Sequence, residues 1–236
     1  MYVDNLPLYL YAPGKYAERM ARRVPAPLHP QLRFIVLVRE PVTRALSQIH
    51  HQRRVGCKWW CEDGMRGRVS EEDLVRELSN TTVDAVVRSQ YAEHLRAWFK
   101  HFPRNQFLVL SMERMLSDAA AMSQTLERIA SFLAVDTWDP RVLQRAVASD
   151  RGPGGHNASS ARQRAGDAAL RRFNCSAQTE ITDAFAASSR SLSLLLASTL
   201  TRAPPEQEPF RPFPDPRSPE CISNAPRNPS PSVGMN

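Results

Sequence analysis

The residues of this chain best suited to bind an anion are Arg39, Arg44 and Ser47, which follow the apolar run at 34–38. Arginine presents a planar fork of donors that matches phosphate or sulfate oxygens. Pro41 stands between the two arginines, and proline is favoured in the first turn of a helix, where its missing N–H is not needed. Arg44 and Ser47 are three residues apart and would share one face of that helix. The spacing predicts a strand, a basic turn, and a helix whose N-terminal N–H groups add to the attraction for an anion.

The elements around this turn predict an α/β protein. Apolar runs at 34–38 and 107–110 predict two buried strands. Apolar side chains at helical spacing predict helices over 15–23, 41–54, 91–102 and 118–133, and a capping box predicts another helix start at Ser70. Strands that alternate with helices favour a parallel sheet built from βαβ units. Such sheets bind ligands beyond the carboxyl ends of their strands, which is where Arg39 stands.

The pattern Arg-x-Pro-x-x-Arg-x-x-Ser at 39–47 resembles the 3′-phosphate-binding segment of sulfotransferases that use 3′-phosphoadenosine 5′-phosphosulfate (PAPS). Segments 5–9, 91–110 and 111–118 resemble other parts of the heparan and chondroitin sulfotransferases, in the same order. The resemblance implies a P-loop-like parallel sheet flanked by helices. It also implies that Arg39 and Ser47 contact the 3′-phosphate of PAPS, while Arg44 contacts the same nucleotide or, as the alternative we favour, braces the turn or the sheet.

Two parts of that family pattern have no counterpart here. The family's phosphosulfate loop, a glycine-rich turn with a lysine, would precede Asn5, and Asn5 itself stands where the family has lysine. We therefore expect a fold that lacks the first strand and the phosphosulfate loop, and we assign no catalytic base. Arg162 and Arg164 resemble a late family loop that closes over the nucleotide, with a solvated loop as the alternative.

The resemblance implies transfer of a sulfonyl group from PAPS to a hydroxyl or amine, most naturally on a carbohydrate. One alternative is a catalytically incomplete domain that binds the nucleotide or an anionic glycan, and another is a basic nucleic-acid-binding module. The net charge of +7 suits all three. A nucleic-acid platform would need aromatic side chains among the arginines, and Trp59–Trp60 beside Lys58 is the one such pair. We therefore expect a nucleotide donor and a glycan acceptor as partners, and no nucleic acid.

Residues 1–200 are predicted to form a partial sulfotransferase domain, and residues 201–236 a disordered tail. Ten of the 19 prolines lie in that tail, which has almost no apolar periodicity. A proline-rich ligand for a partner domain is the alternative. No run approaches the roughly 18 consecutive apolar residues that predict a membrane span. The resemblance nonetheless implies a Golgi lumen or membrane location.

The four cysteines allow three disulfide pairings. They are Cys57, Cys61, Cys175 and Cys221. Triplets that begin at Asn80, Asn157 and Asn174 fit the N-glycosylation pattern. A zinc site built from Cys57 and Cys61 with His50 and His51 would not have the spacing of a standard finger, so we expect no metal. We likewise assign no catalytic role to the two histidines, because the resembled family does not place its base there.

Overall fold

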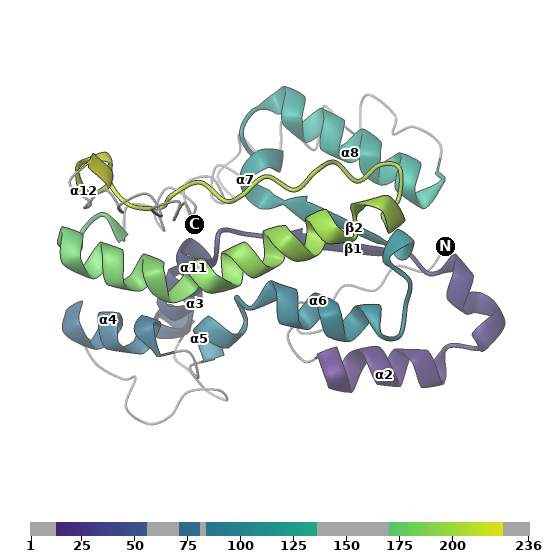
Figure 1. The fold of residues 1–236 in the computed structure, drawn as a ribbon, viewed down its shortest axis with the longest axis horizontal. Coiled ribbons are helices and arrows are strands. Elements are labelled where there is room, and N and C mark those ends of the chain that lie inside the picture. The colour runs from purple at the N-terminus through teal and green to yellow at the C-terminus, as the bar shows by residue number, and fades with distance from the viewer. Residues whose placement is uncertain (1–12, 56–70, 81–83, 136–169, 224–236) are drawn as a thin grey trace, which may run out of the picture.

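The computed structural model describes residues 13–55, 71–80, 84–135 and 170–223 (Figure 1). Its elements are α2 (Pro13–Arg23), η1 (Ala26–Gln31), β1 (Phe34–Val38), α3 (Pro41–Val55), α4 (Glu71–Ser79), α5 (Asp84–Val87), α6 (Tyr91–Phe99), η3 (Arg104–Gln106), β2 (Phe107–Ser111), α7 (Met112–Met115), α8 (Ala119–Leu133), α11 (Cys175–Ser198), η4 (Leu200–Arg202) and α12 (Pro219–Ser223).

The two strands of the described residues pair in parallel and in register. Phe34 pairs with Phe107 and Val38 with Ser111, so both strands end at the same edge of the sheet. The predicted parallel α/β sheet flanked by helices is confirmed. This register brings the residues that follow each strand close together in space, although they are far apart in sequence.

Helices cover both faces of the sheet (Figure 1). On one face, Val38 and Val109 pack with side chains from α6 and α11. Next to them, Phe34 and Phe107 stack at 4.6 Å within an aromatic cluster that includes Trp98. The aromatic stripe of the predicted 91–102 helix is therefore part of the core, although α6 itself ends at Phe99.

The other face of the sheet is only partly covered. Leu108 and Leu110 of β2 pack against Phe132 of α8. Ile35 and Leu37 of β1 are exposed, because α8 lies against β2. The expectation of a fully buried strand at 34–38 is therefore wrong within the described part of the chain, where β1 is an edge strand.

The segment after η4 lies along the domain between α8 and α11, as Figure 1 shows in yellow. The Gln207 side chain pairs with the backbone of β2: its Oε1 accepts from the Val109 N–H at 2.8 Å, and its Nε2 donates to the Val109 carbonyl at 3.1 Å. Phe210 and Phe213 pack against the cluster around Val109. Residues 201–223 therefore differ from the disordered extension expected from composition, because specific side chains give them partners. The division of the chain at residue 200 stays a prediction.

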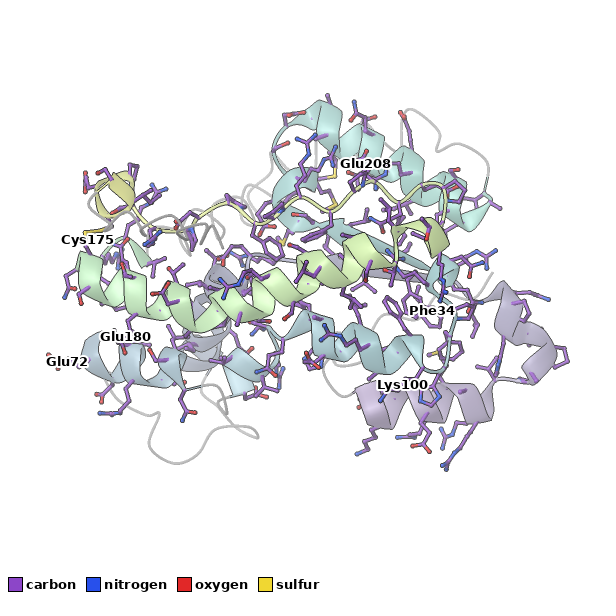
Figure 2. All side chains as sticks on the ribbon, viewed as in Figure 1. Phe34, Glu72, Lys100, Cys175, Glu180 and Glu208 are labelled. Atoms are coloured by element: carbon purple, nitrogen blue, oxygen red, sulfur yellow. A yellow bond between two sulfur atoms is a disulfide. The ribbon has the colours of Figure 1, made fainter. Side chains whose placement is uncertain are left out.

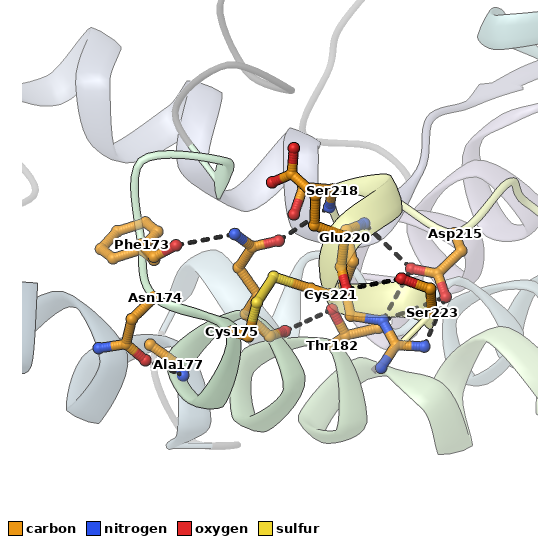
Figure 3. Close-up of a disulfide and its surroundings, with 12 residues drawn as sticks. Phe173, Asn174, Cys175, Ala177, Thr182, Asp215, Ser218, Glu220, Cys221 and Ser223 are labelled. Carbon is orange, nitrogen blue, oxygen red and sulfur yellow. Dashed lines mark hydrogen bonds and ion pairs between the residues drawn. A yellow bond between two sulfur atoms is a disulfide. The ribbon is translucent and has the colours of Figure 1, made fainter. Parts of the chain in front are cut away.

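A disulfide fixes the far end of this segment to α11. Cys175, the first residue of α11, is bonded to Cys221 of α12 (Figure 3). Beside it, the Gln178 side chain donates to the Phe173 carbonyl at 2.7 Å and accepts from the Ser218 N–H at 2.8 Å. Of the three pairings open to the sequence, the structure has one that joins Cys175 to Cys221, and Cys57 and Cys61 lie outside the described residues.

The described residues bear on two further expectations, which concern membrane spans and glycosylation. None of the helices in the described ranges is both long and apolar enough to cross a membrane. Of the glycosylation triplets, Asn80 and Asn174 are exposed, and Asn174 caps α11 by accepting from the Ala177 N–H at 3.0 Å. Asn157 lies outside the described residues, and glycosylation stays a prediction.

We expect removal of the disulfide to destabilise the protein. The two cysteines are 46 residues apart. Closing a loop of that length lowers the conformational entropy of the unfolded chain, which stabilises the folded state by about 2–4 kcal/mol. Cys221→Ser should lower the free energy of unfolding by that amount in urea denaturation under oxidising conditions. A reducing agent should remove the difference between the two proteins, and a difference that persists in reductant would contradict this account.

Candidate functional site

The turn after β1 places an arginine whose donors are not all used by the protein. Arg39 follows Val38 directly, at the carboxyl end of the strand. Its Nε and Nη2 atoms are buried and have no hydrogen-bond partner among the described residues. A buried donor without a partner costs about 1–3 kcal/mol, and more when it is charged. An anion at this edge of the sheet would provide the missing acceptors.

The backbone of this turn is held by side chains from two other elements. The Glu40 N–H donates to Glu113 Oε1 at 2.7 Å, and the Arg39 N–H donates to the Tyr91 hydroxyl at 3.4 Å. Glu113 belongs to α7, directly after β2, and its Oε2 accepts from the Ser111 hydroxyl at 2.8 Å. The direction of the chain at Arg39 is therefore set by groups that lie 52 and 73 residues further along.

Glu40 caps the helix that follows. Its carboxylate accepts from the Val42 N–H at 2.9 Å and from the Thr43 N–H at 2.7 Å. The expectation that the first N–H groups of this helix attract an anion is wrong for these two groups, because both donate to Glu40. The reason is local: the residue just before Pro41 is an acid of the right length to reach them.

Burial makes the Glu40 carboxylate costly to ionise. The side chain is only 5% exposed, and this burial raises its pKa from 4.5 to about 7 despite the hydrogen bonds from Thr43 and Val42, which lower it. The nearby Glu113 carboxylate raises it further. A negative charge close to Arg39 therefore depends on pH in the neutral range.

Arg44 uses its donors inside the protein. Its Nε donates to the Ser89 hydroxyl at 2.8 Å, its Nη1 donates to Gln48 Oε1 at 2.9 Å, and its Nη2 donates to the Ala85 carbonyl. Burial lowers its pKa. Gln48 is held in turn by Asp84, to which it donates at 2.8 Å. The geometry fits the bracing role that the sequence analysis preferred, since Arg44 ties α3 to α5.

The remaining predicted site residues are placed only in part. Ser47 is half-buried on α3, one turn beyond Arg44. Arg162 and Arg164 lie outside the described residues, as do the side chains of His50 and His51. The roles of Arg39, Arg44, Ser47, Arg162 and Arg164 in nucleotide binding stay predictions.

Sequence reasoning missed Glu40, Glu113 and Tyr91. For Glu40 the sequence signal is weak, because the residues preferred as helix N-caps are Asp, Asn, Ser and Thr rather than Glu. For Glu113 and Tyr91 the only signal in the sequence is their position. Glu113 comes directly after β2, and Tyr91 is the first residue of α6. Both reach the turn that follows β1.

An open cavity of about 450 Å³ adjoins this region at the end of β2, between α7, α8 and the segment at 207–214. Glu113, Arg114 and Arg128 are among its lining residues. Glu208 forms ion pairs with both arginines, at 3.3 Å in the case of Arg128. Figure 2 labels Glu208 where the chain passes α8. Among the described residues, no group of three or more histidine, cysteine or acidic side chains is arranged to bind a metal ion.

The raised pKa of Glu40 predicts a pH-dependent stability. The folded state holds a proton on Glu40 that the unfolded state releases above pH 4.5, so this carboxyl stabilises the fold at low pH and loses that effect as pH rises to about 7. The loss amounts to about 3 kcal/mol. Chemical denaturation of the wild type and of Glu40→Gln should give free energies of unfolding whose difference shifts by about this amount between pH 4 and pH 8. A pH-independent difference would contradict the burial of an ionisable group here.

Comparison with known proteins places this turn within a family. Residues 21–149, more than half of the chain, match the sulfotransferase domain. The chain is 31% identical over 125 residues to mouse heparan sulfate glucosamine 3-O-sulfotransferase 3B1, which is 52% of this chain and 30% of that protein. It is 31% identical over 125 residues to human heparan sulfate glucosamine 3-O-sulfotransferase 6, or 52% of this chain and 34% of that protein. Over 116 residues it is 28% identical to the Xenopus laevis bifunctional heparan sulfate N-deacetylase/N-sulfotransferase 1, or 48% of this chain and 13% of that protein.

The matched stretch spans about a third or less of the length of these relatives. The sulfotransferase-domain match at residues 21–149 includes β1, the turn at Arg39 and Glu40, all of α3, and β2 with Glu113. The family that the strand, basic turn and helix indicated is confirmed: the chain belongs to the sulfotransferase domain family.

Proposed function

We propose that this chain binds PAPS and takes part in the transfer of its sulfonyl group to a hydroxyl or amine of a carbohydrate. The observation that carries the proposal is the pair of buried, unpartnered nitrogens on Arg39 at the carboxyl end of β1. Two oxygens of a phosphate monoester can accept the two parallel N–H groups of a guanidinium fork. The 3′-phosphate of the donor is the group that we assign to Arg39, with Ser47 as a second contact.

The reaction is a sulfonyl transfer in which the bond between sulfur and the bridging phosphate oxygen breaks. A new bond forms between sulfur and the acceptor oxygen or nitrogen, the acceptor proton passes to a base, and adenosine 3′,5′-bisphosphate leaves. The described residues that we assign act on binding and orientation, and we name no base. The names of the similar proteins favour a heparan sulfate type of acceptor, in which glucosamine is the modified sugar.

The Golgi lumen is the compartment that we propose. The disulfide between Cys175 and Cys221 supports it, because such bonds persist in oxidising compartments. The similarity to heparan sulfate sulfotransferases favours the same compartment.

Arg39→Ala should weaken the binding of adenosine 3′,5′-bisphosphate by about 100-fold or more, because two charge-assisted hydrogen bonds are lost. Isothermal titration measures this affinity. The same variant should leave the melting temperature of the unliganded protein unchanged or higher, since Arg39 Nε and Nη2 have no partner among the described residues. Arg19→Ala, which removes an exposed arginine of α2, is the matched control and should bind like the wild type. Unchanged affinity in Arg39→Ala would refute the proposed site.

Labelled sulfonyl transfer from PAPS to desulfated heparan sulfate tests the second half of the proposal. We expect label in the glycan, and less of it with Arg39→Ala. Bisphosphate binding without transfer would instead favour the alternative of a domain that binds nucleotide or glycan only. Binding of RNA with no response to the bisphosphate would favour the nucleic-acid module.

A further inference from the structure

The turn that presents Arg39 has two backbone N–H groups that are not part of the sheet ladder. One of them, on Arg39, makes a long contact of 3.4 Å with the Tyr91 hydroxyl. The other, on Glu40, donates to Glu113 at 2.7 Å, the length of a charge-assisted hydrogen bond. Glu113 is therefore the stronger of the two restraints on the backbone at this point.

Glu113 is itself fixed in place on its far side. Its second oxygen accepts from the Ser111 hydroxyl at 2.8 Å, and the same hydroxyl accepts from the Arg114 N–H at 3.4 Å, capping α7. Ser111 is the last residue of β2 and pairs with Val38 across the sheet. A short chain of hydrogen bonds thus runs from the end of β2, through the Glu113 carboxylate, to the turn after β1.

The charges around Glu113 agree with a role that is internal to the protein. Each of its oxygens accepts a hydrogen bond from the protein, one from the Glu40 N–H and the other from the Ser111 hydroxyl. Its carboxylate also faces Glu40, and its negative charge adds to the burial that raises the pKa of Glu40. A carboxylate near an anion site repels the anion, so Glu113 would be a disadvantage there unless it served to hold the turn.

We infer that Glu113 is a positioning residue for the donor nucleotide: it fixes the Arg39–Glu40 backbone so that Arg39 Nε and Nη2 face the 3′-phosphate. The inference rests on the proposed function. According to it, Glu113 affects nucleotide binding only by positioning Arg39, whereas a general role in folding would affect the stability of the whole protein.

The first test compares two substitutions at the same position. Glu113→Ala removes the acceptor for the Glu40 N–H, and we expect the dissociation constant for adenosine 3′,5′-bisphosphate to rise about tenfold. Glu113→Gln retains a carbonyl oxygen for that N–H and should stay within about threefold of the wild type. Glu127→Ala, at an exposed acid of α8, is the control and should have no effect.

The second test asks whether the loss is confined to the 3′-phosphate. Adenosine 5′-monophosphate lacks that group, so its affinity should be the same in the wild type and in Glu113→Ala. A double-mutant cycle adds a stricter condition: in an Arg39→Ala background, Glu113→Ala should weaken bisphosphate binding no further. Equal losses for both nucleotides, or additive losses in the cycle, would overturn the inference.

Failure of the inference can be told apart from failure of the proposed function. If Arg39→Ala itself leaves bisphosphate binding unchanged, the proposed function fails. If Arg39→Ala weakens binding and Glu113→Ala does not, the function stands and the inference is wrong. Should Glu113→Ala not fold, Ser111→Ala leaves Glu113 Oε2 without its partner and should give a smaller loss with the same selectivity for the 3′-phosphate.

Discussion

In-register parallel pairing of β1 with β2 is the constraint on which the site depends. Because Val38 lies opposite Ser111, both strands end together, and the next residues along each strand meet at one edge. The 2.7 Å hydrogen bond from Glu40 to Glu113 is possible only in that register. A slip of one residue would turn every side chain of β1 to the other face, exposing Phe34 and Val36 and moving the turn away from Glu113.

The same turn shows why anion binding here depends on a side chain more than on the helix. The N-terminus of α3 has the positive end of a helix dipole, but the Glu40 carboxylate already occupies its Val42 and Thr43 N–H groups. Because these two N–H groups are already used, the proposed anion site relies on the Arg39 side chain. Because burial raises the pKa of Glu40 to about 7, the capping carboxyl takes up a proton near neutral pH and then carries no negative charge.

Much of this arrangement can be predicted from the sequence, and the part that cannot is the part set by distant contacts. The strands, the helix after Pro41 and the basic turn follow from apolar periodicity and from the position of proline. Tyr91 and Glu113 reach the turn from 52 and 73 residues away, which no local pattern encodes. The order of residues 201–223 is hidden from composition for a related reason. Composition averages over all residues of the segment, whereas single residues hold it: Gln207 contacts Val109, and Cys221 is bonded to Cys175.

The arginines show most clearly what the sequence leaves undecided. Arg39, Arg44 and Arg104 have the same side chain and stand beside strands or helix starts, so their residue type alone does not show which of them lacks partners in the protein. The structure separates them by the supply of acceptors. Arg44 donates to the Ser89 hydroxyl and to the Gln48 amide oxygen. Arg104 donates to the Gln207 amide oxygen and its guanidinium carbon lies 5.5 Å from the centre of the Phe99 ring, although its Nε has no partner among the described residues. Arg39 has two buried nitrogens for which the described residues offer no acceptor. Burying a charged nitrogen without an acceptor is costly, and this difference in partners distinguishes Arg39 from Arg44.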